Sequence, residues 1–311
     1  MKAIAVTGAS GFIGSYVVEF LRRSGYSVTG VTRARHYKGS HGVVECNYLD
    51  VNRLTSVLSG HETVVHIAGL AHLSYVAARN SEHAFRTANV DSARSVGGAA
   101  RKAGVSRIIL VSSAGVMGRS SPPGGFNDQD TPHPYDPYTK SKYLAELKLQ
   151  ELETPGFGAI ILRPPMVYGK GAPGNFQRLS RWIARGWPIP VGVCPPRRSV
   201  IGISNLCEAI AAAVKAPKPA GGAMLVADPP SLLVSEFIEE MGASMGRPAR
   251  VIAVSPAILR LAARALGRSQ DVQRMNEAFE LAGTAARDVL GWVPRFSTRD
   301  ELRKAFGAES P

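Results

Sequence analysis

The segment TGASGFIG at residues 7–14 constrains the fold of this 311-residue chain more than any other feature. It follows an apolar run at residues 4–6 and opens a stretch of helical period over residues 11–24. Glycines at i, i+3 and i+6 behind a strand allow a sharp turn, a close approach of phosphates and tight helix packing. The start of the helix favours negative charge. The pattern therefore predicts a nucleotide diphosphate site, and a turn with only packing glycines is the alternative.

The rest of the first half alternates short apolar runs with segments of helical period. This rhythm predicts an α/β fold of the Rossmann type, a doubly wound parallel sheet with helices on both faces. After residue 165 the pattern is less regular, and we expect helices near 175–185, 204–214, 235–244 and 256–267. The chain is thus expected to hold a dinucleotide-binding Rossmann domain over residues 1–165. A smaller C-terminal α/β substrate domain would occupy residues 166–311, with some segments returning to the first sheet.

Composition narrows the class of protein. The net charge of +13 and the pI near 10.0 indicate an anionic partner, such as a phosphorylated substrate, a nucleic acid or an acidic membrane surface. The three cysteines are far apart and show neither metal-site nor disulfide spacing. No apolar run approaches the roughly 18 residues of a membrane span. We expect a cytoplasmic protein without a metal site.

The end of the second expected strand bears on the cofactor. In NAD-specific Rossmann folds an acidic residue about 20 residues after the glycines holds the ribose hydroxyls. Here the strand ends in VTRAR, which places Thr32 and Arg33 at that position. Arg33 or Arg35 could bind a 2′-phosphate, so the sequence favours NADP(H) over NAD(H). Solvated surface arginines are the alternative.

The segment YTKSK carries a second chemical signal. Tyr138 and Lys142 lie four residues apart on an expected helix and therefore share a face. A nearby ammonium would lower the pKa of the phenol and let it exchange a proton with an alcohol or ketone. Ser112 and Ser113 end an expected central strand, at the edge where α/β sheets bind ligands. Chance spacing on a helix and a simple strand-ending turn are the alternatives.

Seven ordered motifs together resemble the extended short-chain dehydrogenase/reductase family, the NAD-dependent epimerase/dehydratase group that acts on nucleotide sugars. They span residues 1 to about 215 and are TGASGFIG, VVHIAGLAH, Asn89, ILVSSAG, the pair Tyr138 and Lys142, LRPPMVYG and RRSVIGISNL. The segment RDVLGWVPRFS adds a weaker match near the C-terminus.

The resemblance implies roles for individual residues. Ser113, Tyr138 and Lys142 would be catalytic, and Lys142 would also hold the nicotinamide ribose. Asn175 and Arg198 would contact the diphosphate of a UDP-sugar. Family members often form dimers, so a homodimer is expected. The cofactor-binding positions would be Gly8, Gly11, Phe12, Ile13, Gly14, Thr32, Arg33, Asp50, Ala68, Gly69, Asn89 and Lys142.

Several departures from the family pattern affect the expected reaction. Ala71, Met117 and Met166 occupy positions where a UDP-galactose 4-epimerase often has other residues. These departures argue against a standard UDP-galactose 4-epimerase, and Arg33 favours NADPH and hence net reduction. We expect a hydride transfer between NAD(P)(H) and C4 of a UDP-linked hexose, by a 4-keto reductase of surface-polysaccharide sugar biosynthesis. The first alternative is a UDP-hexose or UDP-N-acetylhexosamine 4-epimerase.

A second alternative is a non-catalytic relative that senses NAD(P) or binds RNA, although the retained serine, tyrosine and lysine argue against it and no nucleic acid is expected. Arg260, Arg264 and Arg268 form a basic stripe at four-residue spacing. A solvated helix face explains this stripe, and weak association with an acidic membrane surface is the alternative.

Overall fold

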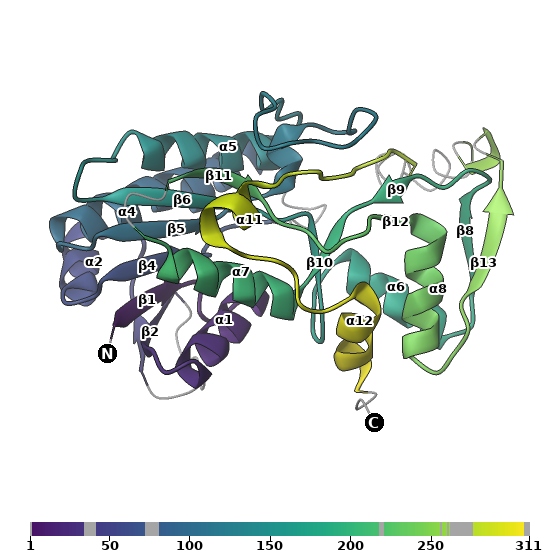
Figure 1. Ribbon diagram of the computed structural model, residues 1–311, viewed down its shortest axis with the longest axis horizontal. Coiled ribbons are helices and arrows are strands. Elements are labelled where there is room, and N and C mark those ends of the chain that lie inside the picture. The colour runs from purple at the N-terminus through teal and green to yellow at the C-terminus, as the bar shows by residue number, and fades with distance from the viewer. Residues whose placement is uncertain are drawn as a thin grey trace.

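The computed structural model describes residues 2–33, 42–71, 81–217, 221–255, 257–259, 261 and 276–307. At its centre lies a seven-stranded sheet of order β11-β6-β5-β4-β1-β2-β3, in which every pair is parallel (Figure 1). This order confirms the Rossmann-type α/β fold. The strands are β1 Ala3–Thr7, β2 Ser27–Thr32, β3 Val43–Glu45, β4 Thr63–His66, β5 Arg107–Val111, β6 Gly158–Arg163 and β11 Gly222–Leu225.

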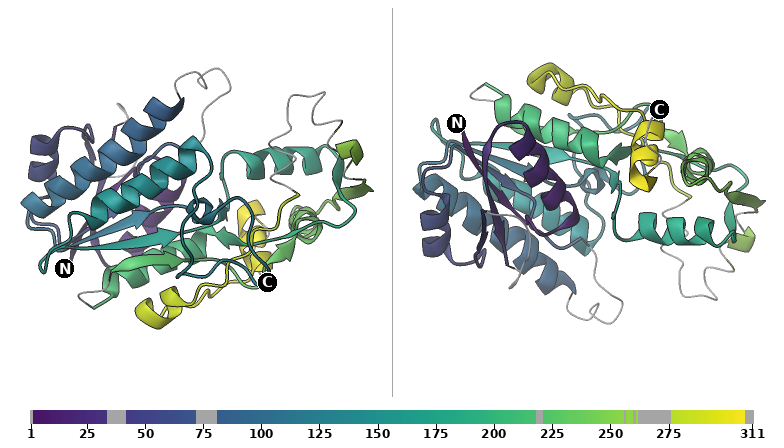
Figure 2. Two further views of the ribbon diagram at one scale, coloured as in Figure 1. Left: turned by 90° about the horizontal axis from the view of Figure 1, so that it is seen from above. Right: turned by 90° about the horizontal axis from the view of Figure 1, so that it is seen from below.

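Helices cover both faces of this sheet, as the two views of Figure 2 show. One apolar core lies between the sheet and α1, α7 and α11, and a second lies between the sheet and α2, α4 and α5. Because both faces are covered, every residue of β4 and β5 is buried. The helices are α1 Phe12–Arg23, α2 Val51–Leu58, α4 Ser92–Lys102, α5 Pro137–Gln150, α7 Ile203–Lys215 and α11 Ala285–Leu290.

The helix ahead of β5 contains a π-helical turn. It begins with α3 Ser81–Phe85, continues as η2 Arg86–Asp91 and ends with α4. Such turns frequently mark functional positions. Asn89 lies in this turn and is buried.

The helix α5 begins where its capping residues predict. The Asp136 side chain accepts a hydrogen bond from the Thr139 backbone N–H at 2.7 Å, and Pro137 is the first helical residue. This start places Tyr138 in the first turn and Lys142 one turn later.

Beyond residue 165 the chain leaves the sheet, returns to it and leaves again. The segment α7–β11 belongs to the sheet, since β11 pairs with β6 at its edge. The remaining elements surround a separate core that includes Tyr168, Phe176 and Phe237. They are β7 Met166–Tyr168, α6 Asn175–Ala184, β8 Pro188–Gly192, β9 Arg197–Arg198, β10 Val200–Gly202, β12 Leu232–Leu233, α8 Val234–Ser244, β13 Arg250–Val254 and α12 Thr298–Phe306. In Figure 1 this smaller part lies to the right of the sheet.

The stretch between η3 (Ala114–Met117) and α5 is partly buried and anchors the C-terminal segment. Phe126 is buried and forms a bridge with Leu281. The Asp128 carboxylate accepts hydrogen bonds from the backbone N–H groups of Leu225 at 2.7 Å, Thr284 at 2.7 Å and Ala285 at 2.9 Å. This stretch therefore joins the edge of the sheet to the chain's last part.

Within the described ranges, none of the helices combines the length and apolar character needed to traverse a bilayer. The basic stripe of Arg260, Arg264 and Arg268 lies outside the described residues, and so does Arg35.

Candidate active site

The glycine-rich turn after β1 depends on its glycines for backbone packing. Gly8 has φ +74°, and a Cβ there would lie 2.7 Å from the Ala68 backbone nitrogen. A Cβ on Gly14 would lie only 2.0 Å from the Gly8 carbonyl oxygen. Ala68 thus borders the turn.

The helix that follows this turn has an uncapped start. Gly11 is the exposed N-cap of α1, and no side chain caps it. The first-turn N–H groups of Phe12 and Ile13 therefore have an open approach for an anion. This donor set fits a dinucleotide diphosphate.

Tyr48 supports the turn, a role that no sequence pattern predicts. Its hydroxyl accepts a hydrogen bond from the Gly8 N–H and donates one to the Val31 carbonyl, both at 2.8 Å. Burial raises the pKa of Tyr48 to about 12. The Arg33 guanidinium lies 5.6 Å from the centre of the Tyr48 ring. Tyr48 therefore links the glycine turn to the end of β2.

The other residues expected around the adenosine half differ in exposure. Thr32 is buried, and its hydroxyl is 2.7 Å from the Ser10 hydroxyl. Arg33 is exposed at the end of β2. Asp50 is also exposed, and its side chain caps α2 by accepting a hydrogen bond from the Arg53 N–H at 2.9 Å. Of these three residues, Arg33 is the one whose charged side chain lies directly after β2.

Asn89 brings the turn after β4 against α5. Its amide oxygen accepts from the Leu70 N–H at 2.7 Å, and its amide nitrogen donates to the Leu70 carbonyl at 3.1 Å and the Ser141 hydroxyl at 2.8 Å. A Cβ on Gly69 would lie 2.8 Å from the Asn89 amide oxygen and 3.9 Å from Lys142 Nζ. Glycine at 69 thus permits this close approach.

Ser113 and Tyr138 come together at the carboxyl end of β5. Ser113 caps η3, and its Oγ accepts from the Gly115 N–H at 3.2 Å. Burial raises the pKa of Tyr138, whereas a side-chain hydrogen bond with Ser113 acts in the opposite direction. The expected lowering of this pKa by Lys142 is therefore not what governs Tyr138 here, because desolvation of the phenol is the larger effect.

Lys142 lies beneath the same strand end. It is 6% exposed, and its Nζ donates a 2.7 Å hydrogen bond to the Val111 carbonyl. Burial lowers the pKa of Lys142 to about 8, and the Glu146 carboxylate opposes that shift. Ser113 and Tyr138 are thus hydrogen-bonded to each other, and Lys142 is bonded to the end of the strand that precedes Ser113.

Ser112 and Ser113 have different environments. Ser112 is buried, and its hydroxyl donates to the Glu146 carboxylate. Glu146 also forms a buried ion pair with Arg163, with 2.6 Å between Oε2 and Nη2. The sequence did not predict the pairing of Glu146 with Arg163. The one available signal was the four-residue spacing of Lys142 and Glu146, which places Glu146 on the same helix face as Lys142.

The two residues expected to contact a UDP-sugar diphosphate lie in the smaller part. Asn175 is the first residue of α6, and its Oδ1 accepts from Arg178 at 2.5 Å. Arg198 donates to the Glu277 carbonyl at 2.7 Å and lies 5.3 Å from the centre of the Phe279 ring.

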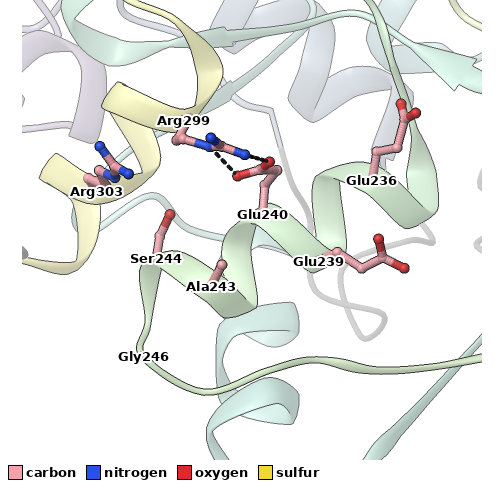
Figure 3. Close-up of a pocket in the computed structure, with 8 residues that line it drawn as sticks. All are labelled: Glu236, Glu239, Glu240, Ala243, Ser244, Gly246, Arg299 and Arg303. Atoms are coloured by element: carbon pink, nitrogen blue, oxygen red, sulfur yellow. Dashed lines mark hydrogen bonds and ion pairs between the residues drawn. The ribbon is translucent and has the colours of Figure 1, made fainter.

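A hollow of about 500 Å³ between α8 and α12 lies elsewhere, and none of the expected site residues lines it (Figure 3). Within it the Glu240 carboxylate and the Arg299 guanidinium form an ion pair. Among the described residues, no three histidine, cysteine or acidic side chains gather in a way that could hold a metal ion.

Comparisons with known proteins place this geometry in a family context. The model of the NAD dependent epimerase/dehydratase family matches residues 4–227. The chain is 29% identical over 314 residues to the UDP-glucose 4-epimerase of Vibrio cholerae, with 99% of this chain and 95% of the relative covered.

A second sequence relative and a solved structure are also similar to this chain. The chain is 28% identical over 254 residues to the N-acetyl-alpha-D-glucosaminyl-diphospho-ditrans,octacis-undecaprenol 4-epimerase of Escherichia coli O157:H7, covering 78% of this chain and 72% of the relative. The solved structure of MoeE5 in complex with UDP-glucose and NAD has a TM-score of 0.80 at 24% identity, with 98% and 97% of the two chains covered.

Proposed function

Because the chain belongs to the NAD-dependent epimerase/dehydratase family, we propose that it is a 4-epimerase of a UDP-linked hexose or N-acetylhexosamine. The grouping of Ser113, Tyr138 and Lys142 beside the glycine turn carries this proposal. The two relatives described above are both named as 4-epimerases. They support the epimerase, which the sequence ranked second, more than the 4-keto reductase that it ranked first.

The residues present fit a nicotinamide dinucleotide. The first-turn N–H groups of α1 would hold its diphosphate, while Gly69 and Lys142 would face the nicotinamide ribose. When bound, the nicotinamide would supply the hydride acceptor and donor of the reaction.

The chain's own residues would handle the proton. Tyr138 would take the proton of the C4 hydroxyl as the sugar is oxidised. It would return the proton to the ketone oxygen after the 4-keto sugar has rotated to present its other face. Ser113 would donate a hydrogen bond to that oxygen as charge develops on it. The Lys142 ammonium would favour the phenolate form of Tyr138 during the transfer. Lys142 is buried, whereas Ser113 and Tyr138 are half-buried.

Asn175 and Arg198 would hold the substrate's diphosphate in the smaller part. An arginine matches phosphate geometry with two parallel hydrogen bonds. We propose that Arg198 orients one face of the diphosphate while Asn175, at the start of α6, contacts the other.

The test is conversion of UDP-glucose or UDP-N-acetylglucosamine by the purified protein without added cofactor, followed by NMR of the anomeric protons. We expect interconversion of the C4 epimers. Tyr138→Phe should abolish this interconversion and leave NAD binding unchanged. Tyr26→Phe, at a distance from the site, is the control and should leave the interconversion intact. Stoichiometric NADPH oxidation by a UDP-linked 4-keto sugar, with no epimer formed, would instead establish the reductase.

The expected preference for NADP(H) is a separate proposal that rests on exposed Arg33 at the end of β2. Titration of NAD⁺ and NADP⁺ tests it. Arg33→Ala should weaken binding of NADP⁺ at least tenfold more than binding of NAD⁺, and equal losses would refute the 2′-phosphate role.

We also propose a homodimer, as the family resemblance implies. Sedimentation equilibrium tests it, and a monomer at micromolar concentration would refute it. Weak association with acidic membranes remains a proposal that flotation with anionic vesicles checks.

A further inference from the structure

Glu146 connects three elements behind the candidate active site. It lies on α5 one turn after Lys142 and is 1% exposed. Its carboxylate accepts a hydrogen bond from the hydroxyl of Ser112, which follows β5. The same carboxylate forms an ion pair with the guanidinium of Arg163, at the end of β6. Arg163 contributes two donors, because its Nε also lies 3.2 Å from Glu146 Oε1.

These contacts hold the strand that bears Ser113. The Ser112 N–H donates to the Leu162 carbonyl and the Ala114 N–H donates to the Pro164 carbonyl, both at 2.8 Å. Arg163 also donates to Met117 Sδ at 3.1 Å, in the turn that follows Ser113. The residues on both sides of Ser113 are therefore bonded to Leu162 and Pro164, which flank Arg163 of the Glu146–Arg163 pair.

We propose that Glu146 is a positioning residue that fixes the end of β5 and supplies the negative charge facing the Lys142 ammonium. The proposal rests on the proposed function of Ser113, Tyr138 and Lys142. No substrate or cofactor contact is assigned to Glu146 itself.

The charge argument follows from what surrounds Lys142. The titratable groups that interact with it are Glu146 from α5 and His66 from β4, and Arg163 from β6 lies on the far side as the ion-pair partner of Glu146. Burial lowers the pKa of Lys142 to about 8, and Glu146 is the group that opposes this shift. His66 is neutral near pH 7, because its pKa is lowered to about 3. Removing the Glu146 charge should therefore move the Lys142 pKa further down, toward or below neutrality.

Two variants separate charge from packing. Glu146→Gln keeps an acceptor for Ser112 but leaves the Arg163 guanidinium buried without its counter-charge, which is strongly destabilising. Glu146→Gln combined with Arg163→Met removes both charges, and replacing a whole buried pair is often nearly neutral for stability. The double variant therefore keeps the test open if the single variant folds poorly.

The readout is the pH titration of Lys142 by NMR of protein labelled with ¹³C-lysine, with its signal assigned from Lys142→Arg. We expect the midpoint to fall by about one pH unit in both variants. The double variant should regain thermal stability but not the wild-type midpoint. A wild-type midpoint in the double variant would reduce Glu146 to a packing role and overturn the proposal.

The alkaline limb of the epimerase pH–rate profile gives the functional arm. It should move down by the same amount, so that the rate at pH 8 falls about tenfold relative to the rate at pH 6. If the Lys142 midpoint moved but the alkaline limb of the pH–rate profile did not, the role of Glu146 in catalysis would be overturned. Absence of epimerisation by the wild-type protein would reject the proposed function, while the NMR arm would still decide the role of Glu146.

Discussion

His66 should make the fold sensitive to mild acid. It is the last residue of β4 and is 1% exposed, with Nδ1 2.7 Å from the Thr7 hydroxyl. Its Nε2 is buried and has no hydrogen-bond partner among the described residues. Burial, with a further contribution from the Lys142 charge, lowers the pKa of His66 to about 3. The folded protein therefore keeps this imidazole neutral at a pH where the unfolded chain protonates it.

The sign and the size follow from linkage. An unfolded histidine titrates near pH 6.5, so the folded state binds fewer protons than the unfolded state between pH 6.5 and 3. The stability contributed by His66 is complete above about pH 6.5 and is lost as the pH falls below it. Each pH unit costs about 1.4 kcal/mol, so the loss between pH 7 and pH 5 is about 2 kcal/mol.

The variant His66→Asn isolates this effect. Its amide can take the place of Nδ1 opposite Thr7, but it does not titrate. Urea unfolding at pH 7 gives the cost of the substitution itself, and the same measurement at pH 5 should show the variant losing about 2 kcal/mol less than the wild type. Equal losses in the two proteins would refute the reasoning, because His66 would then be protonated in the folded state as readily as in the unfolded chain.

Four further substitutions test other parts of the structure. Gly14→Ala should lower the free energy of unfolding by about 3 kcal/mol in urea and abolish NAD binding, because its Cβ would meet the Gly8 carbonyl. Gly98→Ala is the matched control, since a Cβ there has open space on α4. It should raise the free energy of unfolding by about 0.5–1 kcal/mol in the same assay. Arg107→Met leaves the carbonyls at the end of α7 without the guanidinium that binds them and should cost about 3 kcal/mol by thermal unfolding, so an unchanged Tm would be contrary to this account. Asp128→Ala should cost about 2 kcal/mol and speed proteolysis within residues 276–290, whereas an unaltered cleavage rate would show that Asp128 does not anchor this segment.

Local patterns allowed much of the sheet to be predicted. The apolar runs, the glycine triplet and the capping pair Asp136–Pro137 each act over a few residues, and all three appear in the structure where the sequence places them. The grouping of Ser113 with Tyr138 could likewise be expected, since the carboxyl end of a central strand and the start of the next helix meet at one edge of a parallel sheet.

Contacts between distant residues could not be predicted in this way. Tyr48 reaches back 40 residues to the Gly8 N–H, and no periodicity marks a tyrosine for that role. The prolines and glycines of the stretch before α5 indicate a surface loop, yet Phe126 is buried because the C-terminal segment covers it. The π-helical turn that holds Asn89 was also invisible, since a single added residue barely alters the helical period.

The return of α7 and β11 to the sheet has a consequence for synthesis on the ribosome. Six of the seven strands have been translated by residue 163, but the edge strand β11 begins only at Gly222. The carbonyl partners of buried Arg107, at residues 213–217, are also made late. A nascent chain that ends between these points carries a nucleotide-binding sheet with an open edge at β6 and an unsatisfied buried cation. Folding of the complete sheet during synthesis therefore has to wait until more than fifty residues beyond β6 have emerged.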